Sequence, residues 1–148
     1  MREQPDLKTR ALRYLARHEH SRLELERKLA PHTDDAAELE TVLDEMERRG
    51  WLSAQRVVEQ TLHNRRTRYG SRRIVRELED KGIAEALITE AARQLRAGEV
   101  DAAREVWRRK FGTLPGDARE RARQMRFLLG RGFDPEAVNK VVNEKNDD

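Results

Sequence analysis

Two stretches of this chain resemble each other at a spacing of fifty residues. In each, a leucine is followed by a glycine and an apolar residue at the same offsets: Leu78, Gly82 and Ile83, then Leu128, Gly132 and Phe133. A fainter third copy spans 21–29, where apolar residues lie four apart, as they do at 74 and 78. Self-similarity near this period is typical of stacked arrays, whose units are too small to bury their apolar faces alone. The sequence therefore predicts one helical unit used three times, with function residing in an extended surface.

Composition favours a thin body over a single deep core. Of the 148 residues, 36% are hydrophobic and 40% are charged, which is lean for one compact domain of this length. The charge is also uneven, because the first fifty residues carry ten basic and twelve acidic groups, while the remainder is basic. Such clustering indicates an anionic or acidic-surfaced partner.

Apolar residues recur at three-to-four spacing in nearly every segment, and no segment alternates like a strand, so the pattern predicts an all-α fold of about nine helices. We expect an elongated array of three tandem three-helix repeats, each resembling a helix-turn-helix unit. The first repeat, 1–50, would hold helices over 6–18, 21–30 and 33–49. The second, 51–98, would hold 53–68, 71–81 and 84–97, and the third, 99–143, would hold 99–110, 117–129 and 134–143. A disordered tail is predicted over 144–148.

Capping residues specify several helix starts. Ser21 and Glu24 have the spacing of a capping box, in which each side chain bonds a backbone amide that the first turn leaves without a partner. Asp134 followed by Pro135 predicts an N-cap with proline at the first helical position. Glycines at 82 and 132 suit the left-handed turn that ends a helix. Packing, rather than binding, is the role expected of the apolar residues beside such turns: Leu52, Ile83 and Phe133.

The usual signatures of an enzyme are missing from the sequence. It has no glycine-rich phosphate loop and no serine or cysteine nucleophile motif, and the absence of cysteine excludes disulfides and thiolate metal sites. No apolar run at the N-terminus indicates a signal peptide or a membrane span. We therefore expect a cytoplasmic protein that is not an enzyme, takes no cofactor and does not contact a membrane.

One short histidine motif requires separate consideration as a metal site. His18 and His20 flank Glu19, but two histidines two residues apart near a helix end are expected to point in different directions. Helical zinc pairs need a separation of four. We therefore predict a solvated loop and no metal. Asp34 and Asp35 stand at the front of a helix, where capping explains them better.

A run of arginines is the strongest candidate for a binding site. No acid interrupts the sequence between Glu59 and Glu77, and this interval contains Arg65, Arg66, Arg68, Arg72, Arg73 and Arg76. On an exposed helix, Arg73 could pair with Glu77 and Arg76 with Asp80. The others surround the Tyr69-Gly70 turn without nearby acids, where guanidinium forks can bind phosphates or carboxylates in bidentate fashion.

A second basic band is more interleaved with acids and is the weaker candidate. It consists of Arg104, Arg108, Arg109, Lys110, Arg119, Arg121, Arg123 and Arg126. From this band we add Arg108, Arg109 and Arg123 to the candidate partner-binding or DNA-binding residues. Three aromatic residues fall where cores or helix ends are expected, and packing is a better prediction for them than base stacking: Trp51, Trp107 and Phe111.

Three ordered motifs give the chain a resemblance to the RecX family, the bacterial regulators of the RecA recombinase. The likeness covers nearly the whole chain and rests on Ala11 through Leu29, on Arg65 and Gly70 followed by Arg73-Ile74-Val75-Arg76-Glu77-Leu78-Glu79-Asp80-Lys81-Gly82-Ile83, and on Leu128-Leu129-Gly130-Arg131-Gly132-Phe133-Asp134. Two departures concern the second repeat. The family often has an acid and a phenylalanine within 52–57, and a proline where Ser71 stands here.

The resemblance implies a function as well as a fold. It implies a monomer that binds RecA filaments on single-stranded DNA along their groove and makes a weak direct contact with the DNA held there. Such a protein restrains filament growth, ATP turnover, strand exchange and the coprotease role, and so damps recombination and the SOS response. We expect five arginines of the run to form the principal contact: Arg65, Arg66, Arg68, Arg72 and Arg73.

Two other functions are compatible with the residues. A DNA-binding module acting without RecA would also have three-helix units with a sharp turn and a high isoelectric point. An adaptor between other proteins would use the acidic first repeat as a second interface. Salt dependence separates the first of these from a filament-binding protein, because contacts with phosphate weaken steeply as salt rises.

Overall fold

The computed structural model describes residues 4–143, and all regular elements in that range are helices. The elements follow the order α1 (Leu7–Arg17), α2 (Arg22–Leu29), the short 3₁₀ turn η1 (Ala30–His32), α3 (Ala36–Arg48), α4 (Ala54–Arg65), α5 (Ser71–Asp80), α6 (Glu85–Ala97), α7 (Glu99–Lys110), α8 (Ala118–Gly130) and α9 (Pro135–Asn143). The expected all-α fold is confirmed. The tail predicted over 144–148 lies outside the described residues.

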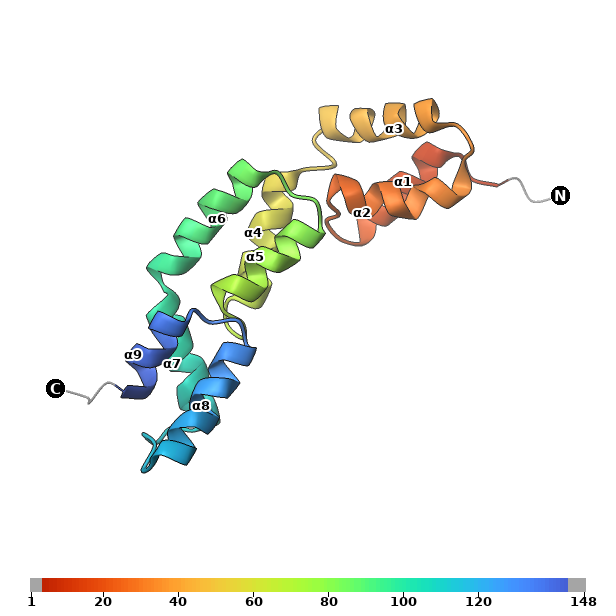
Figure 1. Cartoon of the computed structure of the whole chain (residues 1–148). Helices are drawn as coiled ribbons and strands as arrows, with labels where there is room; N and C mark the ends of the chain where they lie inside the picture. Colours follow the sequence, from red (N-terminus) through yellow and green to blue (C-terminus); the bar gives the residue numbers. More distant parts are fainter. Residues whose placement is uncertain (1–3, 144–148) are drawn as a thin grey trace.

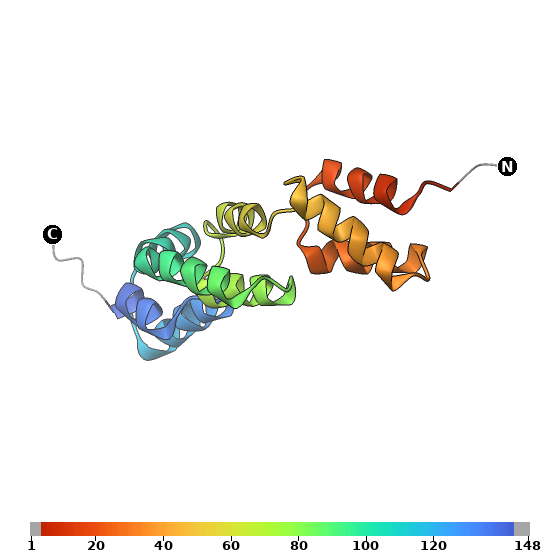
Figure 2. The same ribbon diagram turned by 90° about the horizontal axis from the view of Figure 1, so that it is seen from above.

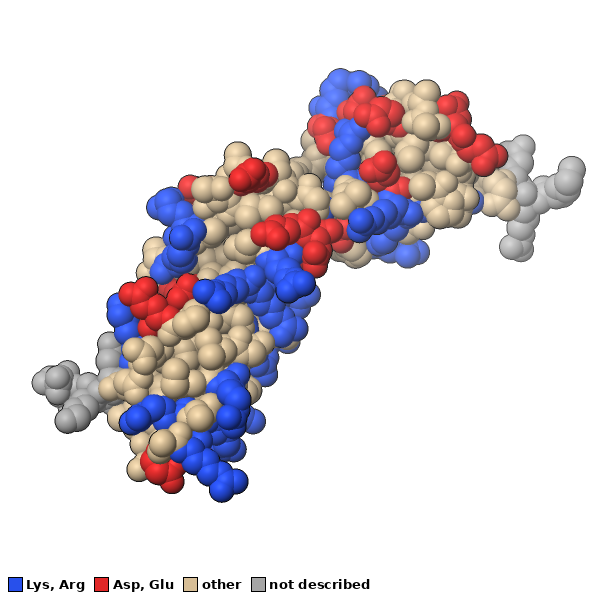
Figure 3. Space-filling view, viewed as in Figure 1, with Lys and Arg blue, Asp and Glu red and all other residues tan. Residues whose placement is uncertain are grey.

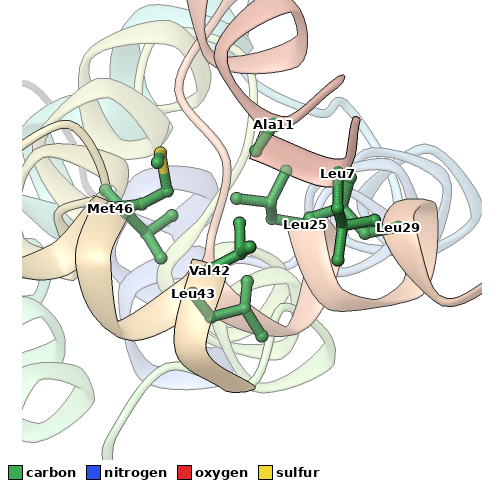
Figure 4. Close-up of a cluster of buried hydrophobic side chains, with 8 residues drawn as sticks. Leu7, Ala11, Leu25, Leu29, Val42, Leu43 and Met46 are labelled. Carbon is green, nitrogen blue, oxygen red and sulfur yellow. The ribbon is translucent and has the colours of Figure 1, made fainter. Parts of the chain in front are cut away.

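Three separate hydrophobic cores hold these helices together, one for each set of three. The core of the first set is formed by Leu7, Ala11, Leu25, Leu29, Val42, Leu43, Met46 and Leu52. Figure 4 shows labelled members of this core pointing toward one another from α1, α2 and α3. The second is formed by Val57, Val58, Leu62, Ile74, Leu78, Ile83, Ala91 and Leu95, and the third by Ala103, Val106, Trp107, Leu128, Phe133, Val138, Val141 and Val142.

The three sets follow one another along an elongated body (Figures 1 and 2). The helices α1 to α3 form one end, α7 to α9 form the other, and the chain bends where α3 leads into α4 (Figure 1). The fold is therefore the expected array of three three-helix repeats. The repeat boundaries, 50/51 and 98/99, stay a prediction.

Local capping places the helix starts where the sequence predicts them. The Ser21 hydroxyl accepts from the Glu24 amide at 3.1 Å, and the Glu24 carboxylate accepts from the Ser21 amide at 3.0 Å. At the front of α9, the Asp134 carboxylate accepts from the Glu136 amide at 3.0 Å. Leu52, Ile83 and Phe133 are buried, as expected of residues that pack beside helix ends.

Backbone hydrogen bonds join the second repeat to the third. The Gly70 amide donates to the Arg131 carbonyl at 2.8 Å, and the Arg72 amide donates to the Gly132 carbonyl at 3.0 Å. The buried carboxylate of Glu99 adds one bond across this joint, because its Oε1 accepts from the Ser71 amide at 3.1 Å. The same oxygen accepts from the Asp134 amide of its own repeat, also at 3.1 Å. A proline at position 71, which the RecX resemblance favours, would lack one of these donors.

The first repeat meets the second fifty residues before the equivalent contact between the second and the third. This earlier contact is made through side chains. A Cβ on Gly82 would lie 2.8 Å from the Leu23 side chain, just as one on Gly132 would overlap Arg73. The exposed Arg56 guanidinium also bonds the Glu19 carboxylate at 2.8 Å. Apart from the turn bonds between residues 46 and 52, no backbone hydrogen bond within 4–143 connects these two repeats. The two joints therefore share a geometry and differ in bonding.

Candidate interaction surface

The arginine run lies where the second repeat meets the third. Arg65 is the last residue of α4, Arg66 and Arg68 lie in the following turn, and the remaining arginines are in the first two turns of α5. The turn is fixed at its end by the bond between Gly70 and the Arg131 carbonyl. Figure 3 shows lysine and arginine side chains gathered along this side of the molecule, from α5 toward α8.

Two of these arginines have acidic partners that sequence spacing did not predict. Arg65 Nε lies 3.2 Å from Glu77 Oε1, and Arg72 Nη2 lies 3.8 Å from Asp134 Oδ2. The expectation that Arg65 and Arg72 lack nearby acids is therefore wrong. The partners are twelve and sixty-two positions away in sequence and meet only because α4, α5 and the front of α9 are packed together.

The predicted pairing of Arg73 with Glu77 is also absent. The Arg73 guanidinium lies over the Tyr69 ring, 4.0 Å from its centroid, while Glu77 faces Arg65 and Lys81. A cation over an aromatic face is attracted by the negative charge of the ring face, which offers the guanidinium an alternative to the carboxylate. Arg73 is thus held in place by a neighbouring ring.

Three arginines of the run have no acidic partner in the described part of the chain. Arg66, Arg68 and Arg76 are exposed, and no carboxylate among residues 4–143 lies within 4.0 Å of their guanidinium groups. This excludes, for the described part of the chain, the predicted pair between Arg76 and Asp80. Unpaired guanidinium groups on a fixed turn are available to phosphates or carboxylates of a partner.

The second basic band divides into paired and unpaired members. Arg108 bonds Glu105 at 2.9 Å, and Arg123 bonds Glu120 at 3.1 Å, each within its own helix. Arg109 instead reaches across to the second repeat, where it donates to the Thr67 carbonyl. Of the three candidates from this band, only Arg109 therefore bonds to the turn that carries the arginine run.

An aromatic row lies beneath the cations and was missed by the analysis of charge patterning. Arg131 lies 5.4 Å from the Tyr69 ring centroid and 5.1 Å from that of Phe127, and Lys110 lies 5.3 Å from that of Phe127. Phe111 continues the row, since its ring meets that of Phe127 edge-on at 5.5 Å. The spacing of four between 69 and 73 and between 127 and 131 was the available signal.

These cations surround a shallow hollow that we call the basic hollow. Its volume is about 270 Å³, and its lining consists of Arg68, Val106, Arg109, Lys110, Phe127 and Arg131. No acidic residue belongs to the lining. The basic hollow is therefore a small concave surface of uniform positive charge with an apolar floor, and it draws residues from both the second and the third repeats.

The histidine motif adopts a geometry that the sequence analysis did not predict. The rings of His18 and His20 stack with their centroids 4.1 Å apart, so the expectation that they point in different directions is wrong. The chain is extended after α1 ends, with His18 at φ −167°, and residues two apart on an extended chain face the same side. His20 is fully buried, which also excludes a wholly solvated loop.

In the part of the chain that the structure describes, this motif has no metal-binding arrangement. Within residues 4–143, no group of three histidine, aspartate or glutamate side chains is placed to hold a metal ion. Asp35 caps α3 by accepting from the amides of Ala37 and Glu38, as its position predicts. Over the same range, no helix combines the length and apolar character needed to span a bilayer.

The aromatic residues assigned to packing differ in their surroundings. Trp107 is buried, and its indole nitrogen donates to Gln124 at 2.8 Å. Phe111 is half-buried in the aromatic row. Trp51 is 40% exposed and lies beneath the Arg49 guanidinium, so the packing predicted for it is largely absent.

Known proteins resemble this chain in both sequence and fold. Residues 55–91 match the family described as RecX, second three-helix domain, and residues 98–142 match RecX, third three-helix domain. Proteins named "Regulatory protein RecX" from Leptothrix cholodnii and Ralstonia nicotianae are 52% and 44% identical to it, over 95% of this chain and 90% and 89% of theirs. The crystal structure of RecX from Lactobacillus salivarius shares the fold, with a TM-score of 0.79 at 15% identity over 92% of each chain. The chain therefore belongs to the RecX family of regulatory proteins.

Proposed function

We propose that this chain regulates RecA, mainly as a negative modulator, by binding the RecA filament on single-stranded DNA. In that role it restrains filament extension, ATP hydrolysis, strand exchange and coprotease activity during DNA repair and the SOS response. Membership of the RecX family supports the regulatory role. The structural observation that carries the proposal is the basic surface across the second and third repeats of an elongated array.

The shape of the molecule suits a filament better than a single small partner. Repeats joined in a row can contact several protomers at once, and linked weak contacts add into tight binding because the later contacts are intramolecular. Assembled filaments would be preferred over free RecA for the same reason. The proposed contact comprises nine residues: Arg65, Arg66, Arg68, Arg72, Arg73, Arg76, Arg108, Arg109 and Arg123.

These nine residues differ in how available their side chains are to a partner. Within residues 4–143, Arg66, Arg68 and Arg76 are exposed and have no acidic partner, and Arg109 donates to the carbonyl of Thr67, which lies between the first two in sequence. Arg108 and Arg123 are ion-paired within the surface of the third repeat, so a partner gains less from them. We expect the unpaired group to supply most of the contact.

A second candidate function is DNA binding without RecA. The basic hollow favours it, because cations gathered without any acid in the lining attract nucleic acid of every sequence. Under this alternative, RecA would be unnecessary for tight binding.

Measuring the salt dependence of binding distinguishes the two functions. Fluorescently labelled single-stranded DNA, bare or coated with RecA in the presence of a slowly hydrolysed ATP analogue, is titrated with this protein at low and moderate salt. The proposal predicts tighter binding to the coated DNA, retained at moderate salt. Equal binding to both, falling by orders of magnitude as salt rises, would establish the DNA-binding alternative.

A further inference from the structure

The basic hollow combines four cations, none of which has an acidic partner among residues 4–143. Arg131 and Lys110 contact aromatic rings, Arg109 donates to the Thr67 carbonyl, and Arg68 makes no hydrogen bond or ion pair through its guanidinium within the described range. Two other arginines of the third repeat, Arg108 and Arg123, are instead ion-paired with glutamates of their own helices. The positive charge of the hollow is therefore left without a neutralising carboxylate.

Helix ends explain why such like charges can gather. Lys110 and Arg109 are the last two residues of α7, Arg131 caps the end of α8, and Arg68 follows the end of α4. The C-terminal end of a helix carries partial negative charge, worth about 0.3–1 kcal/mol to a nearby cation. Three helix ends at one place thus offset part of the mutual repulsion before any ligand binds.

The rings of the hollow restrict the cations to a defined arrangement. Arg131 lies within 5.4 Å of the ring centroids of both Tyr69 and Phe127, and Lys110 approaches Phe127 as well. A side chain that is already held loses less conformational freedom when a ligand binds. The cations are therefore preorganised to bind an anion. The apolar side chains of Val106 and Phe127 in the lining suit a ligand that also has apolar groups.

We propose that the basic hollow binds the phosphodiester backbone of single-stranded DNA, one nucleotide-sized group entering the concavity. This inference rests on the proposed function for its biological role, since it identifies the part of the filament-binding surface that contacts DNA. A volume of about 270 Å³ is close to the lower limit of about 300 Å³ for small-molecule pockets, which fits one nucleotide-sized group. The row of cations continues to Arg73. A backbone with repeated phosphates can contact several of these cations at once, whereas an isolated carboxylate cannot.

Binding to bare DNA, with no RecA present, tests the inference. The anisotropy of a labelled oligothymidine is measured against a variant with Lys110→Gln and Arg131→Gln. A matched control with Arg93→Gln and Arg96→Gln removes the same charge from α6, away from the hollow. We expect the hollow variant to bind about tenfold more weakly and its salt slope to fall by about 1.4, since each lost phosphate contact reduces it by about 0.7. The control should retain both values.

Equal weakening in both double variants would overturn the inference, because it would show a generic effect of net charge. Displacement of the DNA by oligoglutamate as effectively as by unlabelled oligothymidine of equal charge would also overturn it, in favour of an acidic peptide. If circular dichroism shows that the hollow variant is misfolded, Arg68→Gln replaces it, because that exposed side chain makes no hydrogen bond or ion pair with residues 4–143. Failure of this protein to bind RecA filaments would refute the proposed function and leave this DNA result standing.

Discussion

Among single residues, His20 has hydrogen bonds that determine which of its ring nitrogens carries the proton. Lys28 Nζ lies 2.7 Å from His20 Nε2, and an ammonium group can only donate, so Nε2 is the acceptor. The proton then resides on Nδ1, which donates to the His18 carbonyl at 2.9 Å. Burial lowers the pKa of His20 below 6.5, and the positive charge of Lys28 lowers it further, while the bond to His18 and the charge of Glu24 act against them.

This arrangement predicts that the protein is less stable in mild acid. Because the pKa of His20 is lower in the folded chain than in the unfolded chain, the unfolded state takes up the proton first. The stabilising contribution is complete above about pH 6.5 and declines as the pH falls below 6.5 toward the folded pKa. Urea unfolding followed between pH 8 and pH 5 measures the decline.

A substitution tests whether His20 causes this loss of stability in mild acid. In His20→Gln the pH dependence over this interval should be reduced, whereas His63→Gln, an exposed position on α4, should leave it intact. The pKa of Glu90 is lowered to about 2 by its hydrogen bonds to Arg93 and Gln94, so this carboxyl titrates outside the interval. Identical pH profiles for wild type and His20→Gln would show that another group is responsible.

The arginine run could be predicted from sequence, but its bonding could not. Consecutive positions without an acid are visible in the printed sequence, and they do form an exposed basic turn. The partners of Arg65 and Arg72 come from other helices, and the rings that hold Arg131 belong to two repeats. Local charge patterning counts neighbours within a turn of helix and so cannot identify contacts made between repeats.

At the scale of helices and turns, Gly70 allows the second and third repeats to approach closely. Its φ of −87° is ordinary, so the constraint is one of space. A Cβ at this position would overlap the backbone of Phe133, which cannot move aside as a flexible side chain could. The same close approach lets the Gly70 amide reach the Arg131 carbonyl.

We predict that Gly70→Ala destabilises the chain by at least about 1–3 kcal/mol, the usual cost of overpacking. Gly130→Ala is the matched control, because a Cβ at the end of α8 meets nothing within 4 Å. Replacing that helical glycine should stabilise the chain by about 0.5–1 kcal/mol. Chemical denaturation measures both, and a Gly70→Ala variant as stable as Gly130→Ala would disprove the close approach.

Helix positions were more predictable than helix contacts. Capping residues and glycines are local signals, and they placed the helix starts at Arg22, Ala54 and Pro135 within one or two residues. The role of Gly70 depends on Phe133, sixty-three positions away, and Glu99 bonds amides on two other segments. Such contacts arise only when repeats stack, so a single segment contains no sign of them.

At the scale of the whole molecule, the two joints should differ in stiffness. Backbone bonds and the shared Glu99 carboxylate hold the second repeat to the third. The first repeat is held by packing at Gly82 and by the exposed pair between Arg56 and Glu19, and exposed pairs contribute only about 0–1 kcal/mol. We therefore expect the first repeat to change its orientation relative to the other two.

Double electron–electron resonance between pairs of spin labels tests this difference in stiffness. The sequence contains no cysteine, so cysteines introduced for labelling are the only ones present. Spin labels at Thr41→Cys and Thr89→Cys span the first joint, and labels at Thr89→Cys and Arg119→Cys span the second. We predict a broader distance distribution across the first joint. Equally narrow distributions would show that side-chain contacts hold it as firmly as backbone bonds hold the other.

We propose that the basic surface at the second joint carries the regulation of RecA. RecA ATP hydrolysis on single-stranded DNA tests this proposal, with the protein added at substoichiometric amounts before or after filament assembly. Wild type is compared with a variant that replaces all six arginines of the run, Arg65, Arg66, Arg68, Arg72, Arg73 and Arg76, by alanine. A control replaces six arginines of the first repeat: Arg10, Arg13, Arg17, Arg27, Arg48 and Arg49. We predict that wild type and control inhibit hydrolysis and that the folded variant lacking the arginine run does not. Full inhibition by that variant, or none by wild type in either order of addition, would contradict the proposal.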